Sequence, residues 1–418
     1  MSIFGLDGSS PHGGVVGPSV LGLLLLCGCE VGDPNPVVPD RLVLSTDAVH
    51  TLAKLDVVAR VVDLQPTPDG RVLVLNSVSP FFVLLAPDGQ VERQFGEEGG
   101  GPDEFGAPVA LVRGPDQSEV WTYDVPRNAL IRIVPEERRE MALPRDSISP
   151  LTLISFQGAG IRPAPPWLAA TDEGFLVGRS RAWDEGFLLD SNGNVASALP
   201  LWNADILLLR DRGPGVEVEL HTPVADLLGD PGTLYPGATA SLPYPLWTAC
   251  TDGTVGLYDP RTNTLRRLTR DGGQLPSFAL PDERRVELTA DRLFAMFYRQ
   301  LQEDTPTQQL PEQAGLRAQL QGPLDRLVGQ SAPVFPEYAD LRCAPDGTLW
   351  LQLFDIESGR LGHGPEWLRI STDGSRTTLV LPAEFSAFRF GDGRIWGAAL
   401  DPLGVASVSW IDLPGTDP

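Results

Sequence analysis

Histidine, the residue type most often used as a catalytic base or zinc ligand, is scarce in this sequence. The four histidines each stand alone, with no second ligand at metal-binding spacing: His12, His50, His221 and His363. The Gly-x-Ser-x-Gly elbow of common serine hydrolases does not occur either. We therefore predict no catalytic residues and no bound cofactor, with calcium as the one exception left open.

Two loop segments could bind ions. Gly99-Gly100-Gly101 could cradle a phosphate, but the Lys-Ser/Thr and helix that complete such a loop do not follow, so a connection between repeats is favoured. Asp190-Ser191-Asn192-Gly193-Asn194 is similar to the start of a calcium loop, yet position twelve is Leu201, where a bidentate glutamate is needed. We interpret this segment as a hairpin turn.

Two stretches of the chain share one polar pattern. Their matching residues have identical spacing: Tyr123, Asp124, Asn128, Leu130 and Arg132 in one, and Tyr258, Asp259, Asn263, Leu265 and Arg267 in the other. Asp124 and Asp259 could be ligands. Capping of a tight turn between two strands is the favoured interpretation.

A calcium site at the end of a central channel would need Glu, Asn and Asp side chains from distant segments. The sequence neither assembles such a site nor excludes it. Trp121, Trp350 and Trp396 recur at one strand position and could line a ligand funnel, although packing between repeats explains them better.

A recurrent turn marks the elements that would position these residues. In each copy Asp-Gly, or a weaker equivalent, precedes a short apolar strand, and Asp-Gly favours a hairpin because glycine accepts a positive φ. The copies begin at Asp69, Asp116, Asp172, Asp252, Asp346 and Asp392.

A second turn follows the first in four copies, at Asp88-Gly89, Asn192-Gly193, Asp271-Gly272 and Asp373-Gly374. Each unit is therefore two hairpins, or four strands, and the units recur about every 65 residues on average. This pattern predicts an all-β fold, a six-bladed β-propeller over residues 41–418.

The longest insertion, residues 281–336, falls between blades four and five and is predicted to be partly helical. Apolar residues at helical spacing favour an amphipathic helix over residues 286–301 and a weaker one over residues 316–327. A covering element is favoured over a lid or a partner-docking surface.

Closure of the ring needs a strand from outside the sixth repeat, which supplies only about two strands after Asp392. Propellers avoid open sheet edges by completing a blade with strands from both ends of the chain. We expect residues 41–44 or residues 57–63 to pair with the strand that contains Val408 to Ile411.

The charge of the chain argues against polyanionic partners. The net charge is −23, and Lys54 is the only lysine. Without a basic patch, nucleic acid and acidic membrane surfaces are poor partners. A hydrophobic content of 42% fits a globular protein, and we expect a monomer.

Residues 1–28 are predicted to be a signal peptide. An apolar stretch over residues 15–26 leads into Cys27-Gly28-Cys29 and is too short to span a bilayer. Leu26-Cys27-Gly28-Cys29 resembles the lipobox of bacterial lipoproteins, which implies lipidation of Cys29, although no Lys or Arg precedes Arg41. Residues 29–40 are proline-rich and read as a tether.

Two cysteines, Cys250 and Cys343, remain in the mature domain. They could form a disulfide, but inner strands of neighbouring blades could also be too far apart for one. Two buried free thiols are the alternative.

Residues 56–413 resemble the bacterial six-bladed propellers related to NHL-repeat proteins. The best local match is Phe95-Gly96 followed by Gly99-Gly100-Gly101-Pro102-Asp103-Glu104-Phe105, which is similar to the Gly-Pro-Gly-Glu-Phe connection of that family. Peptide-amidating lyases share this connection but bind zinc through several blade histidines, and no histidine stands at a matching place here.

The sequence favours a non-catalytic cell-envelope lipoprotein whose propeller binds a protein, peptide or glycan. Its only membrane contact would be the lipid anchor. The alternative is a metal-dependent lactonase or lyase acting at the channel mouth. Fold alone does not decide between these functions.

Overall fold

Strands account for nearly all of the regular structure that the computed structural model describes. The described residues are 40–413, apart from 57, 115, 117, 128, 135–138, 143–167, 172–173, 181–203, 212–215, 224–245, 260–261, 270–273, 281–285, 296–297, 299–311, 331–336, 355–363 and 402. All of them belong to one compact unit, Val38–Pro418.

The Asp-Gly turns adopt the conformation that their residues favour. Gly70 and Gly347 have φ angles of 85° and 80°, where a side chain would be strained. The aspartate before the glycine caps the turn, as where Asp346 Oδ1 accepts the Thr348 amide at 2.9 Å. These turns join the first and second strands of a sheet.

Five sheets have four strands each, and we name every sheet by its innermost strand. The β3 sheet contains β3 (Val61–Pro66), β4 (Val72–Asn76), β5 (Phe82–Leu85) and β6 (Val91–Phe95), and the β9 sheet contains β9 (Pro108–Arg113), β10 (Val120–Asp124), β11 (Ala129–Val134) and β12 (Arg139–Ala142).

The other three four-stranded sheets follow along the chain. The β13 sheet contains β13 (Leu168–Thr171), β14 (Gly174–Ser180), β15 (Ala204–Asp211) and β16 (Val216–Pro223), and the β17 sheet contains β17 (Leu246–Ala249), β18 (Val255–Asp259), β19 (Thr264–Leu268) and β20 (Phe278–Ala279). The β25 sheet contains β25 (Phe385–Gly391), β26 (Arg394–Leu400), β27 (Ala406–Asp412) and β2 (Val49–Lys54).

Another sheet has five strands, and a short ribbon has two. The β21 sheet contains β21 (Tyr338–Cys343), β22 (Leu349–Leu353), β23 (Glu366–Ile370), β24 (Arg376–Val380) and, at its edge, β1 (Asp40–Val43). The ribbon pairs β7 (Glu97–Glu98) with β8 (Glu104–Phe105).

Burial falls from the inner strands to the outer strands. Every residue of β4, β10 and β18 is buried, which requires packing on both faces of the sheet. Strand β6, at the outer edge of its sheet, is mostly exposed. A sheet whose inner strands are buried on both faces has to stack against a neighbouring sheet on each side.

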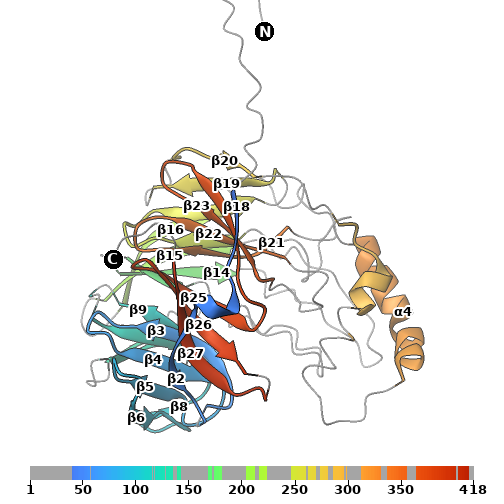
Figure 1. Ribbon diagram of the computed structural model, residues 1–418. Coiled ribbons are helices and arrows are strands. Elements are labelled where there is room, and N and C mark those ends of the chain that lie inside the picture. The colour runs from blue at the N-terminus through green and yellow to red at the C-terminus, as the bar shows by residue number, and fades with distance from the viewer. Residues whose placement is uncertain are drawn as a thin grey trace, which may run out of the picture. The chain divides into compact units, whose positions relative to one another are not determined.

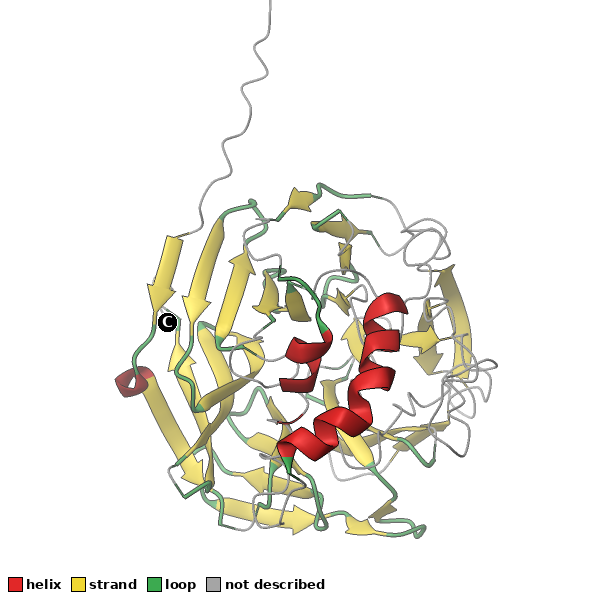
Figure 2. Ribbon diagram, turned by 90° about the vertical axis from the view of Figure 1, so that its right-hand side faces the viewer, coloured by secondary structure: helices red, strands yellow, loops and turns green. Residues whose placement is uncertain are grey.

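The sheets form a closed circuit through their inner strands. Strand β3 contacts β9, β9 contacts β13, β13 contacts β17, β17 contacts β21, and β25 contacts β3. Between the β21 and β25 sheets, Trp350 stacks on Phe390 with ring centroids 4.4 Å apart. Figure 2 shows the strands disposed around a centre. This arrangement confirms the predicted all-β propeller fold.

An N-terminal strand completes the sheet that the C-terminal repeat begins, as expected, but the segments predicted for this role were wrong. Strand β2 lies beside β27 (Figure 1). The two strands pair antiparallel, with His50 opposite Trp410. Residues 61–63 belong to the inner strand β3, because their alternating buried side chains fit the centre of a sheet.

Residues 41–44 also have a partner other than the predicted one. Strand β1 runs parallel to β24, with Arg41 opposite Thr378, and so extends the β21 sheet. A 3₁₀ turn, η1 (Thr46–Ala48), leads from β1 to β2. The N-terminal segment therefore crosses from the edge of one sheet to the edge of the next.

The predicted insertion contains a helix, α4 (Gln313–Gln330), which corresponds to the weaker of the two expected helices. Residues 290–295 of the other are helical. Leu324 and Val328 of α4 pack in a small cluster with Leu288, Leu293 and Phe354, and α4 lies to one side of the sheets (Figures 1 and 2). Among the described residues, no helix combines the length and apolar character that crossing a bilayer needs.

Candidate functional site

The first candidate site is a polar network formed by the inner strands where they converge. Arg389 of β25 is its centre. Its Nη2 donates to Asp63 Oδ2 and to the Leu111 carbonyl, both at 2.7 Å, and its Nε donates to Gln65 Oε1 at 2.9 Å. One guanidinium thus joins the β25, β3 and β9 sheets.

Asp63 is held on all sides by donors. Its Oδ1 accepts the Leu64 amide at 2.8 Å, and its Oδ2 accepts the Leu111 amide at 2.9 Å besides the bond from Arg389. The pairing register shifts between Val61 and Asp63, and this bulge re-aims the strand just before the aspartate.

A second pair repeats this arrangement in the β21 sheet. Arg342 Nε donates to Asp340 Oδ2 at 2.7 Å, and Arg342 Nη1 donates to the Phe388 carbonyl, which lies in a bulge of β25. Burial lowers the pKa of Arg342, but the carboxylates of Asp340 and Asp63 outweigh it, and the pKa is raised. Arg342 is charged at any physiological pH.

Arg113 brings a third guanidinium to the same region. Its Nη2 donates to the Pro66 carbonyl at 3.0 Å. Burial is the main cause that lowers the pKa of Arg113; Asp392 opposes the shift, and Arg389 adds to it. Both Asp392 and Arg389 therefore lie close enough to act on it.

The carboxylates of this polar network are bonded within the network. Asp63 and Asp340 each have a guanidinium and a backbone amide as partners. Within the described ranges, no three His, Cys, Asp or Glu side chains form a group that could hold a metal ion.

The second candidate site is a pocket of about 220 Å³ between the β21 and β25 sheets. Two of its lining groups are buried donors, the indole Nε1 of Trp350 and the Nε of Arg369, which have no hydrogen-bond partner among the described residues. The remaining lining residues are Ala344, Pro345, Asp346, Thr348, Gly391, Asp392, Gly393 and Leu413. Buried donors without acceptors are costly, so a ligand that supplied acceptors in this pocket would be stabilised by them.

The predicted aspartates act within the fold. Asp124 Oδ2 and Oδ1 accept the amides of Gly106 and Ala107 at 2.9 and 3.1 Å, so this side chain ties the connection that enters the β9 sheet. Asp259 pairs with Arg266 at 3.2 Å. The prediction that Asp124 caps the turn between β10 and β11 was wrong in its segment, because the amides that it accepts precede β9.

The Gly99-Gly100-Gly101 run is a connection between sheets. Glu104 Oε2 accepts the Gly101 amide at 2.6 Å, and Arg127 donates to the Gly101 carbonyl at 2.8 Å. An acidic side chain therefore occupies the place that a phosphate would take.

The histidines remain isolated where they are described. His50 of β2 stacks on Trp410, and its Nε2 lies 3.3 Å from Asp412 Oδ2. His221 lies in β16. Cys29, His12, His363 and the segment from Asp190 to Asn194 lie outside the described residues.

Of the three recurrent tryptophans, Trp121 and Trp350 are buried, which favours packing between sheets over a ligand funnel. Trp396 is only partly buried and packs beside Trp410, with ring centroids 5.4 Å apart. Packing thus accounts for Trp121 and Trp396, whereas Trp350 also lines the pocket between the β21 and β25 sheets.

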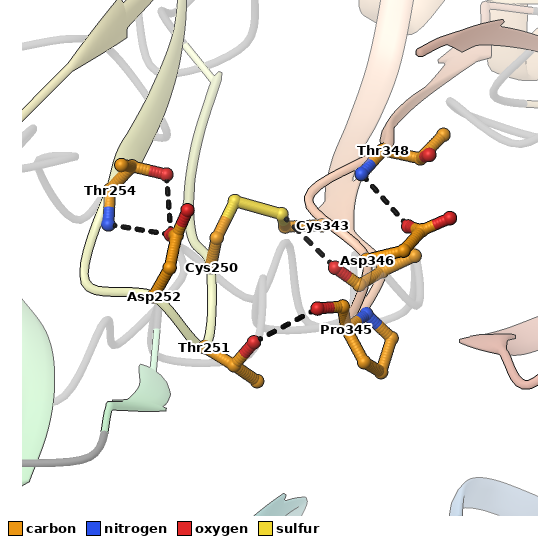
Figure 3. Close-up of a disulfide and its surroundings, with 9 residues drawn as sticks. Cys250, Thr251, Asp252, Thr254, Cys343, Pro345, Asp346 and Thr348 are labelled. Carbon is orange, nitrogen blue, oxygen red and sulfur yellow. Dashed lines mark hydrogen bonds between the residues drawn. A yellow bond between two sulfur atoms is a disulfide. The ribbon is translucent and has the colours of Figure 1, made fainter. Parts of the chain in front are cut away.

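Cys250 and Cys343 form a disulfide, with their Cα atoms 5.2 Å apart. Cys250 follows β17 and Cys343 ends β21, where these inner strands are in contact. The concern that inner strands would be too far apart was wrong. Figure 3 shows a second link beside the disulfide, in which Thr251 Oγ1 donates to the Pro345 carbonyl at 3.2 Å.

Sequence reasoning missed the network of Asp63 and Arg389. A signal was present: Asp63 and Asp340 each stand six residues before the Asp-Gly turn of their repeat, followed by leucine. Such spacing places both aspartates at one position of the inner strand. The arginine partner comes from another repeat, and local spacing cannot identify it.

Comparisons with known proteins return distant structural similarities. No protein-family model and no curated protein matches the chain. A catalytically inactive virginiamycin B lyase from Staphylococcus aureus is 13% identical, with a TM-score of 0.36 over 89% of this chain and 87% of that one. A gluconolactonase from Xanthomonas campestris is 12% identical (TM-score 0.42; 90% and 95% covered). A Bacteroides fragilis protein described as a candidate exported protein is 10% identical (TM-score 0.45; 89% and 98% covered).

Proposed function

We propose that this chain is a non-catalytic binding propeller of the bacterial cell envelope, whose partner is a protein, peptide or glycan. One observation carries the proposal: the inner-strand carboxylates of Asp63 and Asp340 are already hydrogen-bonded, to Arg389 and Arg342 respectively and to backbone amides. A lactonase or lyase acting through a channel metal would need such carboxylates as ligands.

The propeller we propose is six-bladed, monomeric and related to NHL-repeat proteins. The proposal of six blades is supported by the five four-stranded sheets if the five-stranded β21 sheet is taken as a sixth blade with β1 added at its edge. Residues 1–28 would be the signal peptide, Cys29 the lipidated residue, and residues 29–40 the tether to the membrane. The apolar stretch that ends at Gly28-Cys29 supports this assignment.

Two measurements on the chain without residues 1–28 test the proposed function. Peptide and glycan arrays should show saturable binding to one class of ligand. Titration with Ca²⁺ or Zn²⁺ should leave the melting temperature unchanged, and lactones should not be hydrolysed.

The enzyme alternative makes the opposite predictions. A metal-dependent lactonase or lyase would show a saturable rise in melting temperature with one of these ions, together with turnover of a lactone. Asp63→Asn should abolish both effects if the inner-strand carboxylates hold the metal. That result, without binding on either array, would overturn the proposed function.

A further inference from the structure

The β9 sheet contains a tryptophan and an arginine that share one carboxylate. Trp121 and Arg132 face each other across β10 and β11. Trp121 Nε1 donates to Glu119 Oε2 at 2.9 Å, and Arg132 Nη1 donates to Glu119 Oε1 at 2.7 Å. The glutamate thus satisfies two donors with its two oxygens, an arrangement typical of strong charge-assisted recognition.

The β21 sheet repeats the two donors at equivalent positions. Trp350 and Arg369 face each other across β22 and β23. The Ala344 amide bonds to the Thr348 carbonyl at 2.8 Å, as the Gly114 amide bonds to the Glu119 carbonyl at 2.8 Å. Thr348 therefore stands where the β9 sheet has Glu119.

Replacement of the glutamate by threonine removes the acceptor. The Trp350 side chain is only 1% exposed, and neither its Nε1 nor the Arg369 Nε has a partner among the described residues. The pocket of about 220 Å³ is bordered by Thr348, Trp350 and Arg369. The two donors without partners thus belong to residues that line this pocket.

We propose that this pocket binds the carboxylate of a small ligand, which takes the part that Glu119 plays in the β9 sheet. The two oxygens would accept from Trp350 and Arg369. This inference rests on the proposed binding function, and it specifies one chemical group of the ligand, a carboxylate.

The other charged residues that line the pocket define the rest of the ligand. Asp346 and Asp392 also line it, and Asp346 Oδ1 already accepts the Thr348 amide. Two carboxylates beside an arginine suit a ligand that carries an ammonium or hydroxyl group near its own carboxylate. The pocket is smaller than the ~300–1,000 Å³ of drug-sized sites, so it suits a single residue-sized group. A free amino acid and the C-terminal residue of a peptide share this chemistry.

One difference between the sheets decides how the ligand enters. A Cβ atom on Gly114 would lie 2.8 Å from Trp121 Nε1 and 2.9 Å from Glu119 Oε2. Ala344, whose amide makes the equivalent backbone bond, carries a methyl group where Gly114 has none. We infer that this methyl group leaves less room beside Trp350 for a side chain from position 348, so the carboxylate would come from a ligand that enters the pocket.

The indole N–H resonance of Trp350 reports on the site directly. Trp350→Phe assigns that signal among the nine tryptophans in a ¹H–¹⁵N spectrum. The probes are glycine, its amide, and an N-acetylated tripeptide with a free or an amidated C-terminus. We expect the free carboxylates to shift this resonance saturably and the amides to leave it in place. Arg369→Gln should weaken binding about tenfold or more, since it removes a charge-assisted donor.

A transplant of the β9 arrangement is the matched control. Ala344→Gly with Thr348→Glu supplies an internal carboxylate and the space for it. We expect the double variant to move the Trp350 resonance without ligand and to lose its response to every probe. Ala344→Gly alone should keep the response.

The outcomes separate the inference from the proposed function. If glycine shifts the resonance and the tripeptide does not, the ligand is a free amino acid. The reverse result would identify the ligand as the C-terminus of a peptide. An equal response to acids and amides, no response to any probe at 10 mM, or a response that survives in the double variant would overturn the carboxylate site. Each of these results leaves the array experiment, and thus the proposed function, standing on its own.

Discussion

Removal of the disulfide between Cys250 and Cys343 should destabilise the ring by an amount that follows from the length of chain it closes. The perturbation is the double variant Cys250→Ala/Cys343→Ala, because a single substitution leaves a free thiol that can pair elsewhere. Cys250 is buried in the cluster with Tyr258 and Leu341, and alanine keeps part of its packing.

The magnitude comes from the 93 residues that separate the two cysteines. In the chain-entropy model, a closed loop of this length stabilises the folded state by about 4.7 kcal/mol at 25 °C. Spread over the unfolding entropy of 418 residues, this corresponds to a fall in melting temperature of about 5 °C. Most of the effect arises in the unfolded state, which the disulfide restricts.

The assay is urea denaturation of the chain without residues 1–28, both oxidised and reduced, beside the double variant. We expect the oxidised parent to be the most stable and the reduced parent to match the double variant. A Ser409→Ala variant, which alters a buried side chain elsewhere in the fold, serves as the control and should respond to reduction as the parent does.

Two results would refute this reasoning. Two free thiols in the denatured, unreduced protein would show that the bond does not form. An intact bond whose reduction changes the free energy of unfolding by less than about 1 kcal/mol would show that the unfolded chain is not restricted by it.

Three further predictions concern the network, the closure of the ring and the anchor. Arg389→Met leaves the buried Asp63 carboxylate without its guanidinium and should cost about 3–5 kcal/mol, and addition of Asp63→Asn should recover part of this; a loss below 1 kcal/mol in denaturation would contradict the role given to Arg389. Deletion of residues 40–54 should lower the melting temperature of the whole domain because β27 loses β2, whereas deletion of residues 29–39 should not; equal melting curves would disprove closure by β2. Cys29→Ser should release the protein from the membrane fraction of a lipoprotein-processing bacterium, and an intact mass with Met1 retained and no lipid on the parent would refute the anchor.

The fifth prediction concerns alkaline pH. Burial, together with the neighbouring Asp124 carboxylate, raises the pKa of Tyr123 to about 12 from its usual value near 10. The folded protein keeps this phenol neutral, so stability from it is present below pH 10 and is lost as the pH rises towards 12. Tyr123→Phe should flatten the dependence of unfolding free energy on pH between 10 and 12, and an unchanged slope would contradict it.

The repeat of Asp-Gly turns was enough to predict the propeller, because each turn conformation depends on two adjacent residues. Gly70 and Gly347 have the positive φ that this chemistry requires. Ring closure could be predicted in kind, since an open edge is unfavourable whatever the sequence. Its residues could not, because the valine-rich residues 61–63 and the segment 49–54 are both suited to strands, and the choice depends on which position is buried on both faces.

The candidate site depends on contacts between repeats, which spacing along one repeat does not reveal. Asp63 and Arg389 are 326 residues apart and meet only after the ring has closed. The pocket at Trp350 could be suspected by aligning Glu119 with Thr348, but the turns before them differ by one residue in length, and the equivalence becomes evident only from the backbone bonds of Gly114 and Ala344.

The route of the N-terminal segment also determines how this protein would respond to a mechanical pull. A force applied to the chain ahead of Asp40 reaches β1 first, and the four register pairs between β1 and β24 must separate before the load passes to β2. Loss of β1 leaves the β21 sheet with the four strands that the other large sheets have, so the ring stays closed. Strand β1 would thus detach first under tension and could pair with β24 again afterwards, while β2, the strand that closes the ring, remains in place.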